Sequence, residues 1–327
     1  MTIQSCPVEV LDKMFESTAY SDPENAKTNL YSLMLTCSHF RTIAKRHFIR
    51  IVCLPNAEMV NMFASYLKNV VKSGDYGKGV LPIQHLAMAG NYRISRGLSF
   101  RNRSDAEVEA ERIVPFIVTT AAPSLLTLTI VGVDADYLAI DTRELPCVPN
   151  GTTFPNLCDL IALEQHVVPL LYGIPDNRAS QLTYPNLRRL YIPGDTRVNL
   201  HSTLPYLEDL RLEMLNQEYI GSLPEASGHV RSLIIDAPRY SSFTYFGCIG
   251  TPQSRDEYAS KISKYQTLID EVGTPERNGI VIPVEGFTNY INRGRILSAW
   301  ADAVVEGVAC WTTGWVPTIP YIERHEE

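Results

Sequence analysis

The sequence predicts an α/β protein in three parts: a helical N-terminal module over residues 1–50, an irregular solenoid of short strands over 51–238, and a helical capping region over 239–327. Two observations lead to this prediction. Apolar residues recur at helical spacing through the first 50 residues, and a strand-like phrase then recurs down the chain until about residue 238. A chain of 327 residues has the length of one large domain or of two or three smaller ones.

Composition excludes several classes of function. The chain is 45% hydrophobic and 20% charged, which is ordinary for a folded soluble protein. Its net charge of −7 argues against a general nucleic-acid binder, which would carry a basic balance. The longest uncharged run, residues 113–133, is interrupted by Pro115 and Pro123, so it predicts a helix end followed by a strand rather than a membrane span.

Cysteine usage and the N-terminus indicate the compartment. The seven cysteines form no C-x-x-C pair, so we expect neither a disulfide framework nor a metal site. The first residues lack a basic region followed by an apolar core, so no secretory signal is expected. Together these features favour a reducing intracellular compartment, the cytoplasm or the nucleus.

Three short apolar stripes define the N-terminal module. Pro7 suits the first turn of a helix, and Val8, Leu11 and Phe15 follow it at helical spacing. A second stripe covers residues 30–37 and a third covers residues 40–48, after a polar gap over Ser21–Asn29. Three short helices bury little surface by themselves, so their remaining apolar faces are expected to contact a partner.

This module resembles an F-box, the helical module that docks substrate adaptors onto the Skp subunit of SCF ubiquitin ligases. The resemblance lies in PVEVL at residues 7–11, LMLTCSHF at 33–40 and IAKRHFIR at 43–50. In these stretches the module is similar to the F-box proteins of mushroom-forming fungi. Cys6 and Phe40 depart from the Leu and Trp that are common at those positions. The resemblance implies that Skp is bound through Pro7, Val8, Leu11, Phe15, Leu33, Cys37, Phe40 and Ile43.

After a first strand at residues 51–54 and a helix at 58–71, a phrase of the form P-x-L-x-x-L-x-Φ recurs, where Φ is apolar. Close copies begin at Pro123, Pro155, Pro185 and Pro205, and looser copies lie at residues 83–88 and 230–235. The final L-x-Φ alternates apolar and polar residues, as a strand does. Equivalent leucines fall 20 to 42 residues apart, at positions 86, 128, 160, 190, 210 and 233.

Such a repeat is typical of a leucine-rich-repeat solenoid, in which each turn adds one short parallel strand. The phrases PNLRRLYI and PYLEDLRL are similar to those of F-box proteins with leucine-rich repeats. Uneven spacing predicts an irregular solenoid, and an ordinary α/β domain with chance P-x-L turns is the alternative. Exposed strand positions would bind a protein substrate, namely Thr127, Thr129, Arg189, Tyr191, Arg211 and Glu213.

The P-x-L-x-x-L-x-Φ repeat does not recur after Pro238. A strand at residues 280–283 and a helix over 290–307 are expected beyond it, with Leu297, Trp300 and Val304 on the inner side of the helix. Because the ends of solenoids expose apolar surface, this tail is expected to cap the last repeat.

The sequence carries no G-x-S-x-G, H-E-x-x-H, Walker A or dinucleotide motif, and the histidines in or beside the strand phrases, His85, His166, His201 and His229, lack acidic partners at ligand spacing and are expected to be packing or surface residues. We therefore expect a substrate-recognition adaptor of an SCF-type ligase, with Skp and an unknown protein substrate as partners, and without catalytic residues, cofactor, nucleic acid or membrane. The alternative is a repeat-type binding module without ligase coupling, in which the N-terminal helices serve only as a cap. An enzyme with its site on the concave surface is a third class, with no motif in its favour.

Overall fold

A computed structural model provides the structure of the chain. It describes residues 6–21, 23–74, 80–89, 105–131, 148–149, 151–163, 183–193, 204–213, 230, 232–238, 244–245, 248–249 and 278–284, together with residues 263, 267, 297, 300, 301, 303 and 304.

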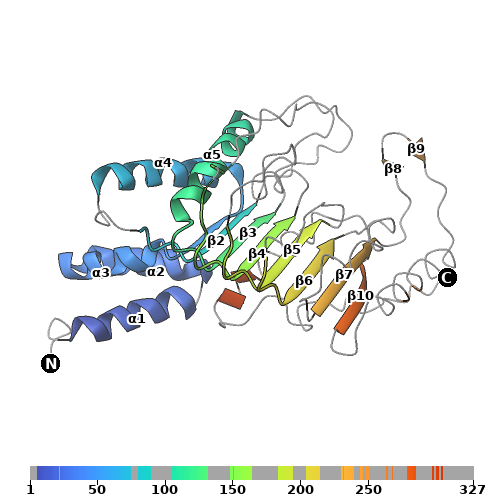
Figure 1. Cartoon of the computed structure of the whole chain (residues 1–327). Helices are drawn as coiled ribbons and strands as arrows, with labels where there is room; N and C mark the ends of the chain where they lie inside the picture. The colour runs from blue at the N-terminus through green and yellow to red at the C-terminus, as the bar shows by residue number, and fades with distance from the viewer. Residues whose placement is uncertain are drawn as a thin grey trace, which may run out of the picture.

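The described elements begin with three helices, alternate between strand and helix from β1 to β3, and continue as a series of strands (Figure 1). The helices are α1 Val8–Ser21, α2 Pro23–Thr36, α3 Ser38–Phe48, α4 Ala57–Ser73 and α5 Asp105–Ala121. The strands are β1 Ile51–Leu54, β2 His85–Ala89, β3 Thr127–Val131, β4 Asp159–Leu163, β5 Arg189–Pro193, β6 Asp209–Glu213, β7 Ser232–Pro238, β8 Thr244–Tyr245, β9 Cys248–Ile249 and β10 Asn278–Val284.

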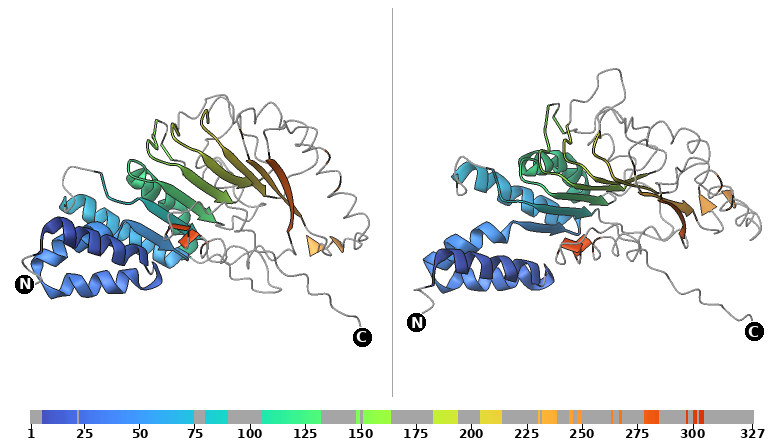
Figure 2. Two further views of the ribbon diagram at one scale, coloured as in Figure 1. Left: turned by 90° about the horizontal axis from the view of Figure 1, so that it is seen from below. Right: turned by 60° about the horizontal axis from the view of Figure 1, so that its bottom comes forward.

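Helices α1, α2 and α3 form a bundle with an apolar core of its own, beside the β1 end of the sheet (Figure 2). Phe15 of α1 meets Phe40 of α3 edge to face, with ring centroids 5.3 Å apart. The polar gap expected over Ser21–Asn29 is wrong, because α2 already begins at Pro23. A proline is favourable at a first helical position, where its missing N–H has no intrahelical partner to lose.

The described strands form one large parallel sheet in the order β1-β2-β3-β4-β5-β6-β7-β10 and a small antiparallel pair, β8-β9. Each strand of the large sheet therefore lies beside the next one along the chain as far as β7 (Figure 1). Strand β10 continues the sheet beyond β7, with Ile280 opposite Ile234. An α/β class is thus confirmed, and the stretch after residue 238 contributes a strand to the sheet.

One side of the sheet carries a row of leucines in register. Leu86, Leu128, Leu160, Leu190 and Leu210 occupy neighbouring positions on β2 to β6, and all five are buried. Helices α4 and α5 pack against this side at the β1 end, in the same apolar core. Helix α4 starts at Asn56, whose side chain accepts a hydrogen bond from the Met59 N–H at 2.9 Å, and stops at Gly74 with φ 66°.

A tight turn introduces β4, β5 and β6 in the same way. In the turn before β4, the N–H of Leu157 donates to the carbonyl of Phe154, with Pro155 at the second position of the turn. The same bond joins Leu187 to Tyr184 and Leu207 to Leu204. The recurring P-x-L phrase is therefore a β-turn that delivers a buried leucine into the core and leads the chain into the strand.

Neighbouring turns are also bonded to one another. Ser124 Oγ donates to the carbonyl of Leu81 at 2.6 Å, Asn156 Nδ2 to that of Pro123 at 2.8 Å, and Asn186 Nδ2 to that of Pro155 at 2.5 Å. These donors occupy equivalent positions in successive turns, so a side chain of each turn is hydrogen-bonded to the backbone of the preceding repeat. Tyr206 is at the next equivalent position and is 64% exposed.

A second repeated bond runs at the start of the strands. Two successive N–H groups donate to a single carbonyl in the preceding strand unit, as those of Cys158 and Asp159 do to Leu126. The acceptor carbonyls, in chain order, are those of Arg50, Gln84, Leu126, Cys158 and Arg188. The uneven sequence repeats thus adopt the same backbone geometry at five successive steps.

Candidate binding face

The side of the sheet opposite the leucine row is the candidate binding surface. We call it the strand face and define it by two rows of β2 to β6 in parallel register. The first row is His85, Thr127, Asp159, Arg189 and Asp209, and the second is Ala87, Thr129, Ile161, Tyr191 and Arg211. Side chains alternate between the two sides of a strand, so these rows share one side. Five of the six residues expected to bind substrate lie here; the sixth, Glu213, ends β6.

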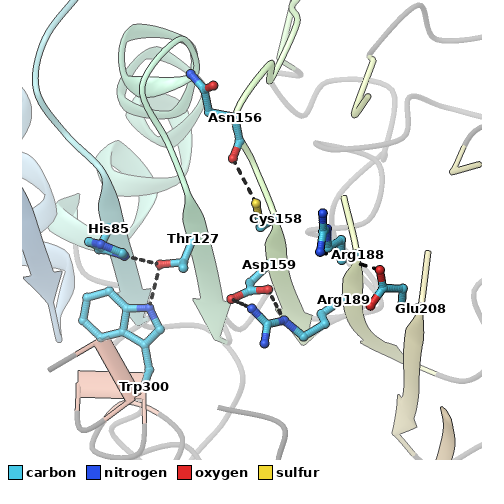
Figure 3. A network of polar contacts seen from close by, with 9 residues as sticks. All are labelled: His85, Thr127, Asn156, Cys158, Asp159, Arg188, Arg189, Glu208 and Trp300. Carbon is cyan, nitrogen blue, oxygen red and sulfur yellow. Dashed lines mark hydrogen bonds and ion pairs between the residues drawn. The ribbon is translucent and has the colours of Figure 1, made fainter. Parts of the chain in front are cut away.

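An ion pair joins β4 and β5 in the first row (Figure 3). Arg189 Nε donates to Asp159 Oδ1, and Nη2 donates to Oδ2 at 2.9 Å. Burial raises the pKa of the Asp159 carboxyl from its ordinary value, while the Arg189 guanidinium opposes that rise. The bidentate pairing fixes both side chains on the strand face.

In the second row, Arg211 of β6 stacks on Tyr191 of β5. The guanidinium carbon lies 4.6 Å from the centroid of the Tyr191 ring, within the range of a cation–π contact. Both side chains are buried, and so is Thr129 at 1% exposure. Thr129, Tyr191 and Arg211 were expected at exposed positions, and this expectation is wrong. Thr127 and Arg189 are partly buried.

The reason for the burial at the β2–β5 end is a helical segment near the C-terminus. Trp300 is 1% exposed and shares an apolar cluster with Ala87, Val131, Ile161 and Tyr191. In Figure 1 this segment is the red block on the side of the sheet away from α4 and α5. The described residues of the helix expected over 290–307 therefore cover the strand face, whereas the sequence analysis placed that helix at the end of the solenoid.

A polar contact accompanies this packing. Trp300 Nε1 donates to Thr127 Oγ1 at 3.2 Å, and His85 Nδ1 lies 3.1 Å from the same oxygen (Figure 3). Burial, followed by the nearby Arg50 charge, lowers the pKa of His85 to about 4. The imidazole is therefore neutral at neutral pH, and the Thr127 hydroxyl can donate to Nδ1 while accepting from the indole. No local pattern in the sequence indicates this contact, because His85 and Thr127 are 42 residues apart.

The eight residues expected to bind Skp do not form one exposed surface. Leu11, Phe15, Phe40 and Ile43 are buried in the core of the bundle. Pro7 and Val8 are exposed, and Leu33 and Cys37 are partly buried. The Cys37 sulfur accepts a hydrogen bond from the Phe40 N–H at 3.4 Å and so caps the start of α3. The large apolar side chains exposed on α1 and α2 are Val8, Val10, Met14, Tyr31 and Leu35.

Two polar contacts of the bundle were not anticipated from the sequence. His47 is buried, and its Nε2 lies 2.9 Å from Asp12 Oδ1, which joins α3 to α1. Arg50 Nη1 donates to Glu16 Oε1 at 2.5 Å, and its Nε donates to Gln84 Oε1 at 2.5 Å. Arg50 thus links α1 to the residue before β2. Separations of 34 and 35 residues leave no local pattern by which a sequence would reveal these pairs.

Within the described residues, no three His, Cys, Asp or Glu side chains lie close enough together to hold a metal ion. In the same part of the chain, no helix combines the length and apolar character needed to cross a membrane. The pKa of the Cys158 thiol is raised, first by burial and then by the Asp159 charge, so the group is a neutral thiol at neutral pH.

Comparison with protein-family models, with curated proteins and with solved structures found no match for the chain.

Proposed function

We propose that the chain is a substrate-recognition adaptor of an SCF-type ubiquitin ligase. In this proposal α1, α2 and α3 form an F-box-like module that binds Skp, and the sheet belongs to an irregular leucine-rich-repeat-like solenoid that binds a protein substrate. The chain carries out no bond chemistry and contributes proximity between substrate and ligase.

The observation that carries the proposal is the division of the apolar core. The bundle has its own core around Phe15 and Phe40, while the strands share a different one around the leucine row. Phe48 packs against both, and β1 begins three residues later at Ile51. Separate cores of this kind support the proposal, because it requires a docking module and a recognition surface in different parts of one chain.

The solenoid half is supported by the repeated geometry of the strands. Successive strands are neighbours, equivalent leucines are in register, and the same pair of backbone bonds recurs at five steps. Each repeat therefore contacts chiefly its neighbours, as in a solenoid. The connections differ in length without disturbing this stack, which explains the uneven spacing in the sequence.

The proposed Skp contact uses the exposed apolar residues of the bundle. Val10 and Met14 are one helical turn apart on α1, and Tyr31 and Leu35 are one turn apart on α2. Leu11, Phe15, Phe40 and Ile43 would support the contact by shaping the bundle. A few exposed anchors of this kind dominate the affinity of most interfaces.

The test is a pull-down of the full chain with a fungal Skp subunit. The wild type is expected to bind, and Val10→Asp with Met14→Asp should weaken binding at least about tenfold, because charges replace apolar anchors. Met62→Asp is the matched control, since Met62 is 72% exposed on α4, outside the bundle. A folded wild-type chain that does not bind Skp would refute the proposal.

A second candidate function is a binding module without ligase coupling, in which the bundle only covers the first strand unit. The link from Glu16 through Arg50 to Gln84 favours it, because this link ties the bundle to the sheet. This candidate predicts that Phe15→Ala lowers the free energy of unfolding while neither the wild type nor the variant binds Skp. Skp binding by the wild type would exclude it.

A further inference from the structure

The C-terminal segment on the strand face has the residue spacing of a helix bound in a groove. Leu297, Trp300, Ala301 and Val304 are helical and follow the spacing i, i+3, i+4, i+7. These four residues belong to one apolar cluster with Ala87, Ile161 and Tyr191 of the second row of the strand face. Amphipathic helices that dock into grooves on other proteins use anchors at these positions.

The surface beneath this segment is separate from the main core. Ala87, Val131, Ile161 and Tyr191 cluster with Trp300, whereas the leucine row and helices α4 and α5 form the other cluster. The bonds that hold β2 to β5 together run from strand to strand. Neither the backbone pairing of these strands nor the main core therefore includes a described residue of the segment.

The segment satisfies the polar groups of the strand face only in part. Trp300 Nε1 donates to Thr127 Oγ1, but Thr129 Oγ1, two residues along the same strand, is fully buried and has no hydrogen-bond partner among the residues that the structure describes. A buried hydroxyl without a partner is costly because it has lost its bonds to water. A helix that also carried a polar group for Thr129 would suit the face better than the chain's own segment does.

We propose that the strand face is a receptor for an amphipathic helix with a tryptophan anchor, and that Leu297, Trp300, Ala301 and Val304 occupy it as an intramolecular ligand. The partner is a helical segment of a substrate with apolar residues three positions before and four positions after its tryptophan, together with a polar group that reaches Thr129. This inference deepens the recognition half of the proposed function and rests on it.

The tether makes the segment a competitor. Residues 285–296 connect β10 to the segment along the chain, and a ligand that is covalently joined to its receptor competes at a higher effective concentration than a free one. A substrate helix must therefore bind the face more tightly than the segment does. A hydrogen bond to Thr129 is one way in which a substrate helix gains this additional affinity. The segment therefore excludes ligands that bind the face only weakly.

The first test uses a fluorescent peptide of residues 293–307 and full-length chains, with binding measured by fluorescence anisotropy. The peptide should bind the Trp300→Ala chain at least about tenfold more tightly than the wild type, whose face is already occupied. The same peptide with Trp300→Ala is the control and should not bind either chain. Equal affinity of the unaltered peptide for both chains would overturn the proposal.

The second test needs no variant and so does not depend on whether Trp300→Ala folds. Hydrogen exchange of the wild-type chain should show amides of residues 297–304 exchanging at least about tenfold faster than those of β3, because the segment detaches while the sheet persists. Equal protection would mean that the segment opens only on global unfolding and would overturn the proposal. Neither test involves Skp, so failure here is distinguishable from failure of the adaptor function.

Discussion

The two sides of the large sheet are built from the same strands but follow different rules. On one side equivalent positions repeat the same residue, as in Leu128, Leu160 and Leu190. On the strand face the equivalent positions change from Thr127 to Asp159 to Arg189. The leucine side must fill one continuous core, whereas the strand face needs only local partners. Repetition therefore marks the side that fills one continuous core, and variation marks the side whose residues make individual contacts.

The largest expected effect comes from breaking the leucine side. Leu160→Ala should lower the free energy of unfolding by about 2–5 kcal/mol, because it leaves a cavity in a fully buried row. Urea unfolding at pH 7 provides the measurement, with Thr127→Ser on the strand face as the control that keeps its hydroxyl. If both variants lost a similar free energy of unfolding, the leucine side would contribute no more to stability than the strand face, against this prediction.

Acid should act on the strand face through His85. Its pKa is about 4 in the folded state and near 6.5 when unfolded, so between these values the unfolded state binds more protons. Stability should therefore fall as the pH is lowered from 6.5 to 4, by roughly 3 kcal/mol in total. The measurement is the wild-type pH dependence of urea unfolding minus that of His85→Gln. An unchanged dependence in the variant would assign the acid sensitivity to other groups.

The ion pair of the strand face should be sensitive to the loss of one partner and tolerant of the loss of both. Arg189→Met leaves the buried Asp159 carboxylate without its partner, which should cost about 2 kcal/mol at pH 7 and raise the pKa of Asp159 further. Adding Asp159→Asn should recover most of that loss. A double variant as unstable as the single one would show that the pair itself, rather than the stranded charge, matters for stability.

The smallest effect concerns the bonds between turns. Asn156→Ala removes the hydrogen bond to the carbonyl of Pro123 and should cost about 1 kcal/mol by thermal or urea unfolding. Tyr206→Ala is the matched control at the equivalent, exposed position and should change stability by less than about 0.5 kcal/mol. If the two substitutions had equal effects, the bonds between turns would not contribute to stability.

The strands were predictable because their pattern is local and repeated. In Leu190-Tyr191-Ile192 the alternation identifies the strand and its two sides, and the Pro185 turn indicates where the chain enters it. The helix near Trp300 was likewise visible as an apolar stripe. A stripe shows that a helix is covered on one side, but it does not show which surface covers it, and the destination of this segment was therefore missed.

The same limit explains the errors at the binding residues. Thr129 and Tyr191 were placed on the correct side of the strand, yet both are buried, and Tyr191 packs in a cluster with Trp300, more than 100 residues away in the sequence. In the N-terminal bundle, Leu11 and Phe15 have the apolar character of contact residues and of core residues alike. Only the packing of α1 against α2 and α3 distinguishes the two roles. The apolar pattern of a single helix carries no information about that packing.

The contact between Trp300 and Thr127 joins residues 173 positions apart and has a consequence during protein synthesis. A ribosome finishes β6 at Glu213 well before it reaches Trp300, and at the usual pace of translation this interval lasts roughly 5–15 s. Throughout that interval the strands emerging from the ribosome present an uncovered surface. If the strand face receives a helix of another protein, as proposed above, that helix has no competition from Trp300 during this interval, and it binds the nascent chain more easily than the finished protein.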